Sequence, residues 1–299
     1  MPPSISTAPE ADNRTHPAPV KGSLLACMPF SGDDGGGAPA RPPGSGVPAR
    51  EGGRIIGSTV ENPLTSVRQA VFRFAEGGAA LSARYHRARL VGAEHLPRHG
   101  PLLLVGNHGV WGYETPAFFH LLHRATGRYP LGLAERGFFK IPLVRTVLPW
   151  LGGVEGTREN ALRSLQEGQL VVCYPGGARE TFKRSQGRYR LRWERALGFV
   201  RLAMQAGVPV VPFAGFGVDD TFFWPPDEDR WCVRLAAEDK YRMPLVMGLG
   251  PLPLPVQLTF AVGEPHEPPP SGASESRVRA FRDRVAASVR RLLLRACHA

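Results

Sequence analysis

The chain has 299 residues and a formal net charge of +11, a balance that predicts an anionic partner such as nucleic acid, anionic lipid or a phosphate-bearing cosubstrate. Its cysteines, Cys27, Cys173, Cys232 and Cys297, form no C-x-x-C pair and no zinc spacing, which argues against a disulfide scaffold and a structural metal site. No run of about 20 apolar residues is present, so we expect no membrane-spanning helix.

The first segment, residues 1–57, is rich in proline, glycine, alanine and serine and has no apolar period. Runs such as Gly32–Gly37 and Arg41–Gly46 bury too little apolar surface to offset the entropy of ordering the chain. We therefore predict a disordered arm over residues 1–57. Residues 58–299 are long enough to form a single domain with a hydrophobic core.

Residues 65–86 predict an amphipathic helix near the start of this domain. Its apolar positions recur at spacings of three, four and seven and are Val67, Val71, Phe74, Leu81 and Tyr85. Such a face either packs on a core or lies on a membrane surface, and the pattern leaves both open.

Short apolar runs and helical stretches alternate through the rest of the chain. We expect strands at 89–91, 102–105, 170–174, 208–213 and 258–262, and helices at 116–125, 159–167, 194–205 and 276–294. Continuous apolar strands separated by helices predict an α/β fold with a mainly parallel central sheet flanked by helices. In such sheets ligands bind beyond the carboxyl ends of the strands, where the loops 106–114 and 175–180 would lie.

A histidine and a carboxylate share the loop that follows the strand at 102–105. Two glycines between them allow a turn that would bring Glu114 onto one imidazole nitrogen of His108 and leave the other for a substrate. A hydroxyl is a poor nucleophile until a base removes its proton, and a carboxylate beside the base fixes the imidazole tautomer. The loop indicates a general base, although a histidine and an acid six positions apart are often a chance pairing.

Two further segments carry glycines or arginines. The strand at 170–174 ends in a turn with Gly176 and Gly177, whose backbone N–H groups suit an oxyanion or a phosphate, although an ordinary turn explains the same residues. Arg188–Trp193 alternates charged and apolar residues at the period of a strand, with one cationic face. His120 and His123 have no further ligands nearby in the sequence, so we expect no metal there.

Taken together and in order, four blocks resemble the glycerolipid acyltransferase superfamily of the lysophospholipid acyltransferase type. The blocks are Asn107–His108 with Glu114, Gly153–Arg158, Tyr174–Glu180 and Val208–Phe213. The resemblance covers roughly residues 64–270 and implies that residues 58–299 form an acyltransferase-type domain.

Two positions depart from the common family pattern. The common motif has an aspartate five positions after the histidine, where this chain has Tyr113, and the acid is Glu114. The common third block has a glutamate directly after the proline, where this chain has Gly176. Both departures are similar to the diacylglycerol-acyltransferase-like branch, which includes transmembrane protein 68 and the phytyl ester synthases. That branch implies a neutral alcohol as the acceptor.

The resemblance implies an O-acyltransferase that moves a fatty acyl group from acyl-CoA, or from an acyl carrier protein, to the hydroxyl of a glycerolipid or other lipid alcohol, with no cofactor. It implies His108 as general base, Glu114 as its orienting acid, and backbone groups near Gly176 and Gly177 as the oxyanion site. The implied residues for the polar groups of donor and acceptor are Asn107, Arg158, Arg179 and Glu180. The implied location is cytoplasmic and peripheral to an anionic membrane surface.

Two other functions fit the sequence. Acylation of 1-acylglycerol-3-phosphate is the alternative within the class, and its negative head group should require Arg158 or Arg179. A basic module that binds membranes or nucleic acid without catalysis is the alternative of another class. No P-loop, G-x-G-x-x-G or nucleic-acid motif occurs, so we do not expect nucleic acid as a partner, and the absence of G-x-S-x-G argues against a serine hydrolase.

Overall fold

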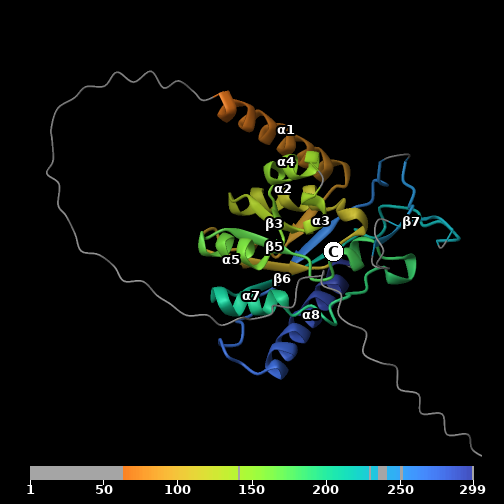
Figure 1. The fold of residues 1–299 in the computed structure, drawn as a ribbon. Coiled ribbons are helices and arrows are strands. Elements are labelled where there is room, and N and C mark those ends of the chain that lie inside the picture. The colour runs from red at the N-terminus through yellow and green to blue at the C-terminus, as the bar shows by residue number, and fades with distance from the viewer. Residues whose placement is uncertain (1–62, 141, 229, 235–240, 250–251, 298–299) are drawn as a thin grey trace, which may run out of the picture.

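Seven strands form one central sheet in the computed structural model, which describes residues 63–140, 142–228, 230–234, 241–249 and 252–297 (Figure 1). The strand order is β1-β9-β6-β2-β5-β3-β4. These strands are β1 (Arg89–Val91), β2 (Leu102–Gly106), β3 (Pro130–Ala134), β4 (Gly153–Glu155), β5 (Leu170–Cys173), β6 (Val210–Phe216) and β9 (Thr259–Val262). Two short strands, β7 (Cys232–Arg234) and β8 (Arg242–Pro244), pair with each other outside this sheet. The predicted arm, residues 1–57, lies outside the described residues.

The sheet is mainly parallel. Strands β6, β2, β5, β3 and β4 run in one direction, whereas β9 pairs antiparallel with β6 and parallel with β1. The predicted α/β fold with a mainly parallel sheet flanked by helices is therefore confirmed. The reversal of β9 and β1 at one edge was not predicted, because an apolar run carries no information on strand direction.

The central strand β2 shows why the sheet needs helices on both faces. Successive side chains of a strand point to opposite faces. Leu102 and Leu104 pack in one apolar cluster with residues of α1 and α2, and Leu103 and Val105 pack in another with residues of α5, α7 and α8. All four side chains are fully buried, which explains the uninterrupted apolar run in the sequence.

Helices cover both faces of the sheet (Figure 1). They are α1 (Pro63–Tyr85), α2 (Thr115–Thr126), α3 (Arg136–Phe139), α4 (Pro142–Val147), α5 (Arg158–Gln166), α6 (Ala178–Thr181), α7 (Gly198–Ala206) and α8 (Glu275–Cys297). Short 3-10 turns lie at η1 (Ala93–His95), η2 (Val110–Gly112), η3 (Leu148–Leu151) and η4 (Ser185–Gly187). Among the described residues, no helix is both long and apolar enough to cross a membrane.

Helix α1 forms at the predicted place but packs through a different face. Phe74 is 85% exposed and Leu81 is 67% exposed, so these large apolar side chains do not join the core. The helix instead packs on α2, where Ala83 is buried and Glu76 contacts His120 at 2.8 Å. The side chains of Val67 and Val71 lie outside the described residues.

The alternating stretch Arg188–Trp193 is not a strand, and this prediction was wrong. Tyr189 has a φ of 56°, which turns the chain out of the extended region. The two sides of the stretch still differ as the pattern requires, because Leu191 and Trp193 are buried while the three arginines that alternate with the apolar residues are exposed.

Candidate active site

The loops at the carboxyl ends of β2, β3, β5 and β6 meet at one edge of the sheet. This is the edge at which open α/β sheets bind ligands. The loop from His108 to Glu114, called the histidine loop below, follows β2, and the Pro-Gly-Gly turn follows β5. Because β2 pairs directly with β5 and β6, the loops after these three strands are neighbours.

The histidine loop closes its carboxylate onto its imidazole. His108 Nδ1 lies 2.6 Å from Glu114 Oε1, and the Gly109 N–H donates to the same oxygen at 2.9 Å. Trp111 and Gly112 both have positive φ values, of 59° and 70°, which reverses the chain within two residues. Glutamate reaches the imidazole across this wide turn at position 114, which accounts for the acid lying one position later than in the common motif.

Glu114 is held in its ionised form. Complete burial by itself would raise the pKa of this carboxyl, but the charge on His108 and the hydrogen bonds from His108 and Gly109 lower it, and the net pKa lies below its ordinary value. Glu114 also precedes the first turn of α2, where a helix favours negative charge. An ionised carboxylate on Nδ1 leaves Nε2 as the nitrogen available to a substrate.

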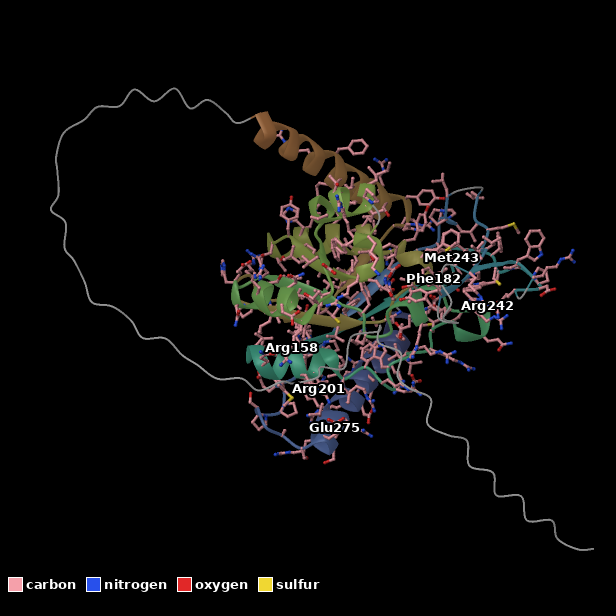
Figure 2. All side chains as sticks on the ribbon, in the orientation of Figure 1. Arg158, Phe182, Arg201, Arg242, Met243 and Glu275 are labelled. Carbon is pink, nitrogen blue, oxygen red and sulfur yellow. The ribbon has the colours of Figure 1, made fainter. Side chains whose placement is uncertain are left out.

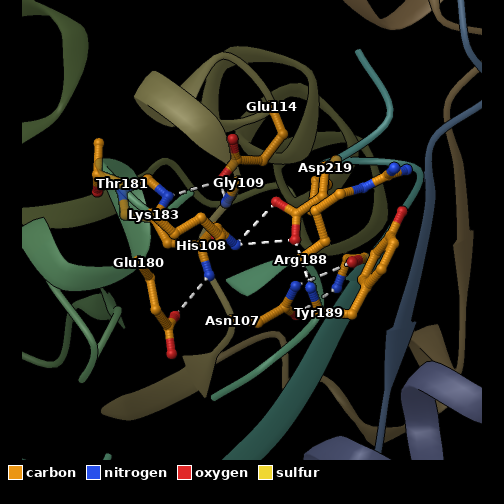
Figure 3. Close-up of polar contacts among 12 residues, drawn as sticks. Asn107, His108, Gly109, Glu114, Glu180, Thr181, Lys183, Arg188, Tyr189 and Asp219 are labelled. Carbon is orange, nitrogen blue, oxygen red and sulfur yellow. Dashed lines mark hydrogen bonds and ion pairs between the residues drawn. The ribbon is translucent and has the colours of Figure 1, made fainter. Parts of the chain in front are cut away.

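Charged side chains also hold the backbone of His108, as Figure 3 shows. The His108 N–H donates to Glu180 Oε2 at 3.0 Å, and Lys183 Nζ donates to the His108 carbonyl at 2.7 Å. Glu180 is fully buried and accepts a second hydrogen bond, from the Arg192 N–H at 2.8 Å. Burial raises the pKa of Glu180, and the charge of Lys183 and the two N–H donors oppose that rise.

Lys183 is part of a buried ion pair. Its ammonium lies 2.8 Å from Asp219 Oδ1, with the two side chains 2% and 0% exposed. Asp219 follows β6 and also accepts the Tyr189 N–H at 2.6 Å. The pair therefore ties the histidine loop, the turn after β5 and the loop after β6 into one polar network. A buried charge needs such a partner, because an unpaired one is strongly destabilising.

Aromatic packing fixes the imidazole ring from one side. The ring of Tyr174, at the end of β5, stacks on His108 with centroids 3.9 Å apart and an interplanar angle of 11°. Burial first, and then the charge of Glu114, raise the pKa of Tyr174 well above its ordinary value, so Tyr174 is a neutral phenol at physiological pH. A side chain at Gly112 would lie 2.9 Å from the imidazole Cε1, so glycine is needed there for space as well as for its φ.

His108 opens onto a large cavity. The cavity has a volume of about 990 Å³ and extends from His108 between α1, β3 and the segment formed by α3, α4 and η3. Most of its wall is apolar or small, including Ala79, Phe119, Leu131, Phe138 and Leu148. Among the described residues, the wall contains the acids Glu76 and Glu135 but no lysine or arginine.

The structure brings together His108, Glu114, Gly177 and the turn after β5, but it separates the other predicted residues from the cavity wall. Asn107 exchanges hydrogen bonds with the backbone of Gly215, at 3.0 and 2.8 Å, and so joins β2 to β6. Gly176 packs against the side chain of Glu180, which leaves no space for a Cβ.

The two predicted arginines also lie outside the wall. Arg158 donates to Gln205 on α7 at 2.6 Å, and Figure 2 shows it near α7 and far in the view from Phe182, which lines the cavity. Arg179 is half-buried in α6, next to Ala178, which does line the cavity. The guanidinium of Arg179 contacts no acid within the described chain.

Three residues of the network were not predicted from the sequence. No role beside His108 was predicted for Lys183, Asp219 or Tyr174. Their contacts with His108 or with one another join positions 36 to 75 apart, so no local spacing signals them. The one available signal was position, because Tyr174 and Asp219 lie just beyond strands that end at the same edge, and Lys183 follows the short helix α6 after one of them.

The chain is similar in sequence to known proteins. Residues 87–215 match the family model described as Acyltransferase. A bovine (Bos taurus) protein described as a DGAT1/2-independent enzyme synthesizing storage lipids is 28% identical over 76% of this chain and 66% of its own length. Phytyl ester synthase 2, chloroplastic, from Arabidopsis thaliana is 36% identical over 42% of this chain and 19% of its own length. The chain thus spans less than two thirds of the curated relatives it matches.

A solved structure of the 1-acyl-sn-glycerophosphate (LPA) acyltransferase PlsC from Thermotoga maritima is also similar. It is 18% identical, with a TM-score of 0.47, and the match covers 79% of this chain and 83% of that one.

Proposed function

We propose that this chain is an acyltransferase that moves a fatty acyl group from a thioester donor, acyl-CoA, to the hydroxyl of a glycerolipid or other lipid alcohol, a proposal that the family match over residues 87–215 supports. The observation that carries the proposal is the contact of 2.6 Å between His108 and Glu114 at the mouth of an apolar cavity of about 990 Å³. The names of the bovine and plant relatives, which refer to storage-lipid and phytyl ester synthesis, support a lipid product.

In the proposed reaction His108 acts as the general base. Its Nε2 removes the proton of the acceptor hydroxyl while the hydroxyl oxygen attacks the thioester carbonyl. The tetrahedral intermediate then expels the thiolate, which takes the proton from the imidazolium, so the products are an ester and a free thiol. Glu114 stabilises the imidazolium between these two steps.

The turn after β5 supports the second part of the mechanism. Gly177 lines the cavity with a φ of 49° and a ψ of −138°, a conformation that exposes backbone without a side chain. We assign the oxyanion site to the backbone of this turn and the phosphates of the donor to Arg179. Glu180 and Asn107 position the histidine loop and the end of β6, since both are occupied by backbone groups.

The cavity wall favours a neutral acceptor over a lysophosphatidate. A phosphate head group needs arginine or lysine beside it, and the described wall has neither. Its volume is at the upper end of the usual range for ligand sites, about 300–1,000 Å³, and its apolar lining suits a long hydrocarbon chain.

We also propose that the enzyme works at a membrane surface without crossing it. Phe74 and Leu81 lie exposed on α1, the helix that forms one side of the cavity, and the formal net charge of +11 suits anionic lipid. These two features support contact between α1 and a membrane surface.

The test is acyl transfer from labelled palmitoyl-CoA to a panel of acceptors presented in vesicles. The panel holds glycerol 3-phosphate, lysophosphatidate, monoacylglycerol, diacylglycerol and a long-chain alcohol. We expect product from one or more of the neutral alcohols. Transfer to lysophosphatidate alone would contradict the neutral acceptor. A complete lack of transfer from palmitoyl-CoA would contradict the proposed donor, and a parallel reaction with acyl carrier protein as the donor would then test the other thioester.

A further inference from the structure

Two hydroxyl groups lie near His108 in residues that line the cavity. They belong to Thr115, the first residue of α2, and to Tyr174, which directly follows β5. The two hydroxyl oxygens are 3.5 Å apart, whereas a hydrogen bond between hydroxyls is usually about 2.7–2.8 Å long. Neither hydroxyl forms another hydrogen bond within the described residues, so each keeps the capacity to bind a further oxygen atom.

The Thr115 hydroxyl borders the same space as the reactive nitrogen of His108. That space lies over Gly112, which lines the cavity and has no side chain to fill it. A Cβ added at Gly112 would lie 3.5 Å from His108 Nε2 and 3.8 Å from Thr115 Oγ1. A small molecule that occupies this space therefore contacts both the general base and one member of the hydroxyl pair.

Tyr174 makes this pair a hydrogen-bond donor. Burial, and then the charge of Glu114, raise the pKa of the phenol well above its ordinary value, so its proton stays on the oxygen. The stacking of its ring on His108 also fixes the phenol relative to the base. A third oxygen about 2.8 Å from both hydroxyls would complete two hydrogen bonds. A buried hydroxyl without a good partner costs stability, so a ligand oxygen explains the pair better than packing does.

We propose that the hydroxyls of Thr115 and Tyr174 bind a second oxygen of the acceptor, on the carbon next to the one that carries the reacting hydroxyl. The inference rests on the proposed function, because it takes the reacting hydroxyl to lie at Nε2 of His108. In a glycerolipid every carbon of the glycerol unit carries an oxygen, whereas a simple long-chain alcohol has a methylene beside its hydroxyl. Thr115 and Tyr174 thus determine specificity for the glycerol unit.

The thioester donor supplies no oxygen that fits this role. Its carbonyl oxygen becomes the oxyanion, which we assign to the backbone of the turn after β5. The neighbours of that carbonyl are a methylene and a sulfur, and a thioether-like sulfur is only a weak acceptor. The second oxygen beside the reacting centre therefore comes from the acceptor.

Two neutral ligands that differ by one oxygen atom test this inference. One is 1-oleoylglycerol, and the other is the mono-oleoyl ester of 1,3-propanediol, which lacks the oxygen on the middle carbon. Binding of each to the full chain is measured in detergent micelles without a donor. Competition between the two for labelled palmitoyl-CoA then gives the ratio of their kcat/KM values. We expect the wild type to favour 1-oleoylglycerol at least about tenfold, because each neutral hydrogen bond contributes about fivefold and the pair forms two.

Four variants separate the hydroxyl pair from its surroundings. Thr115→Val and Tyr174→Phe each remove one hydroxyl, and each should lower the preference for 1-oleoylglycerol about fivefold. Thr115→Ser keeps a hydroxyl and should retain the preference. Thr181→Val is the control and should also retain it, because Thr181 lines the same cavity but its hydroxyl donates to the Gly177 carbonyl at 3.2 Å. Unfolding curves confirm that all four variants fold.

Two results overturn the inference. One is a wild type that favours neither ligand, which leaves no second oxygen for the pair to recognise. The other is a preference that survives both Thr115→Val and Tyr174→Phe, which assigns that oxygen to another group of the cavity wall. The proposed function fails separately, when binding of 1-oleoylglycerol depends on the pair as expected but the wild type transfers no acyl group to it from either thioester.

Discussion

At the scale of the residue, His108 is fixed on every side before a substrate arrives. Glu114 holds Nδ1, Tyr174 stacks on the ring, Glu180 holds the backbone N–H and Lys183 holds the carbonyl. A general base works best when its geometry is set in advance, because misplacement by about 1 Å can cost 10²-fold in rate.

The length of the acid at position 114 is open to a direct test. Glu114→Asp keeps the charge but shortens the side chain, so we expect kcat to fall about 10²-fold as the contact with Nδ1 is lost. Glu114→Gln keeps the length but removes the charge that stabilises the imidazolium, and should cost about 10²–10⁴-fold. Steady-state kinetics with both variants decides this, and an Asp variant as active as the wild type would refute the role assigned to the wide turn.

The ionisation of Glu114 also links stability to pH. Its pKa is lower in the folded chain than the ordinary value of 4.5, so the ionised carboxylate stabilises the fold above that pH. This contribution disappears as the pH falls through the lowered folded-state pKa. Urea unfolding should therefore show Glu114→Gln less stable than the wild type at pH 7, with a difference that shrinks below pH 4.5. A difference that grows on acidification would contradict the direction of the shift.

The buried pair of Lys183 and Asp219 should be sensitive to loss of one partner. Lys183→Met leaves Asp219 charged and buried, so we expect a loss of about 3–5 kcal/mol in the free energy of unfolding. Adding Asp219→Asn removes the orphaned charge and keeps an acceptor for the Tyr189 N–H, so the double variant should recover part of that loss. Chemical denaturation measures both, and a single variant within about 1 kcal/mol of the wild type would show that the pair is not needed for folding.

At this scale the sequence located the pair of His108 and Glu114 but not its supports. The pair lies within one loop, where glycine spacing and a preceding strand make it visible. Glu180 was expected to touch substrate and instead accepts backbone N–H groups, and no role was predicted for Lys183, which forms a buried ion pair. Both roles depend on residues brought close only by the pairing of β2 with β5 and β6.

At the scale of the element, most strands and helices form where apolar period and glycine boundaries place them. The exceptions in the central sheet are β3 and β4, and the short elements α3, α4, α6, β7 and β8 were not predicted either. Strand β3 contains Pro130 and Gly132, which weaken the strand pattern, and Gly132 is needed because a Cβ there would lie 2.9 Å from the ring of Phe119. Strand β4 has only three residues and was taken as part of a glycine-rich segment before α5. Both β3 and β4 form because they pair with neighbouring strands of the sheet, β3 with β5 and β4 with β3.

Helix α5 begins with a side-chain cap that can be removed cleanly. The Thr157 hydroxyl accepts the Asn160 N–H at 3.1 Å, so Thr157→Ala should cost about 1 kcal/mol of stability with little effect on kcat. Thr146→Ala on α4 is the control, since that hydroxyl bonds only the Pro142 carbonyl within its own helix. Thermal unfolding compares the two, and equal losses would show that the cap contributes nothing specific.

At the scale of the whole molecule, the cavity exists because α1 lies across the sheet edge with small residues toward it. Gly77 and Gly78 are neighbours in α1, and a Cβ at either would meet nothing within 4 Å, but only Gly78 lines the cavity. Glycine inside a helix costs about 1 kcal/mol relative to alanine, so open space for a ligand explains Gly78 better than helix stability does.

This neighbouring pair gives a matched test of where the acyl chain lies. Gly78→Leu should fill part of the cavity and lower kcat/KM for long-chain donors at least about tenfold relative to short-chain donors. Gly77→Leu makes the same change in helix propensity but should leave the chain-length profile unchanged. If both variants shift the profile alike, or neither does, the acyl chain does not run beside α1.

The central claim is that His108 is the base of an acyl transfer, and the most direct measurement is kcat and KM of His108→Ala with the preferred acceptor and palmitoyl-CoA. The exposed His99→Ala serves as the control, and unfolding curves confirm that both variants fold. We predict that kcat falls about 10²–10⁴-fold in His108→Ala while KM for both substrates stays close to that of the wild type. Activity within a few-fold of the wild type would contradict the account and would assign the base to another group, such as Glu76 or Glu135, which also line the cavity.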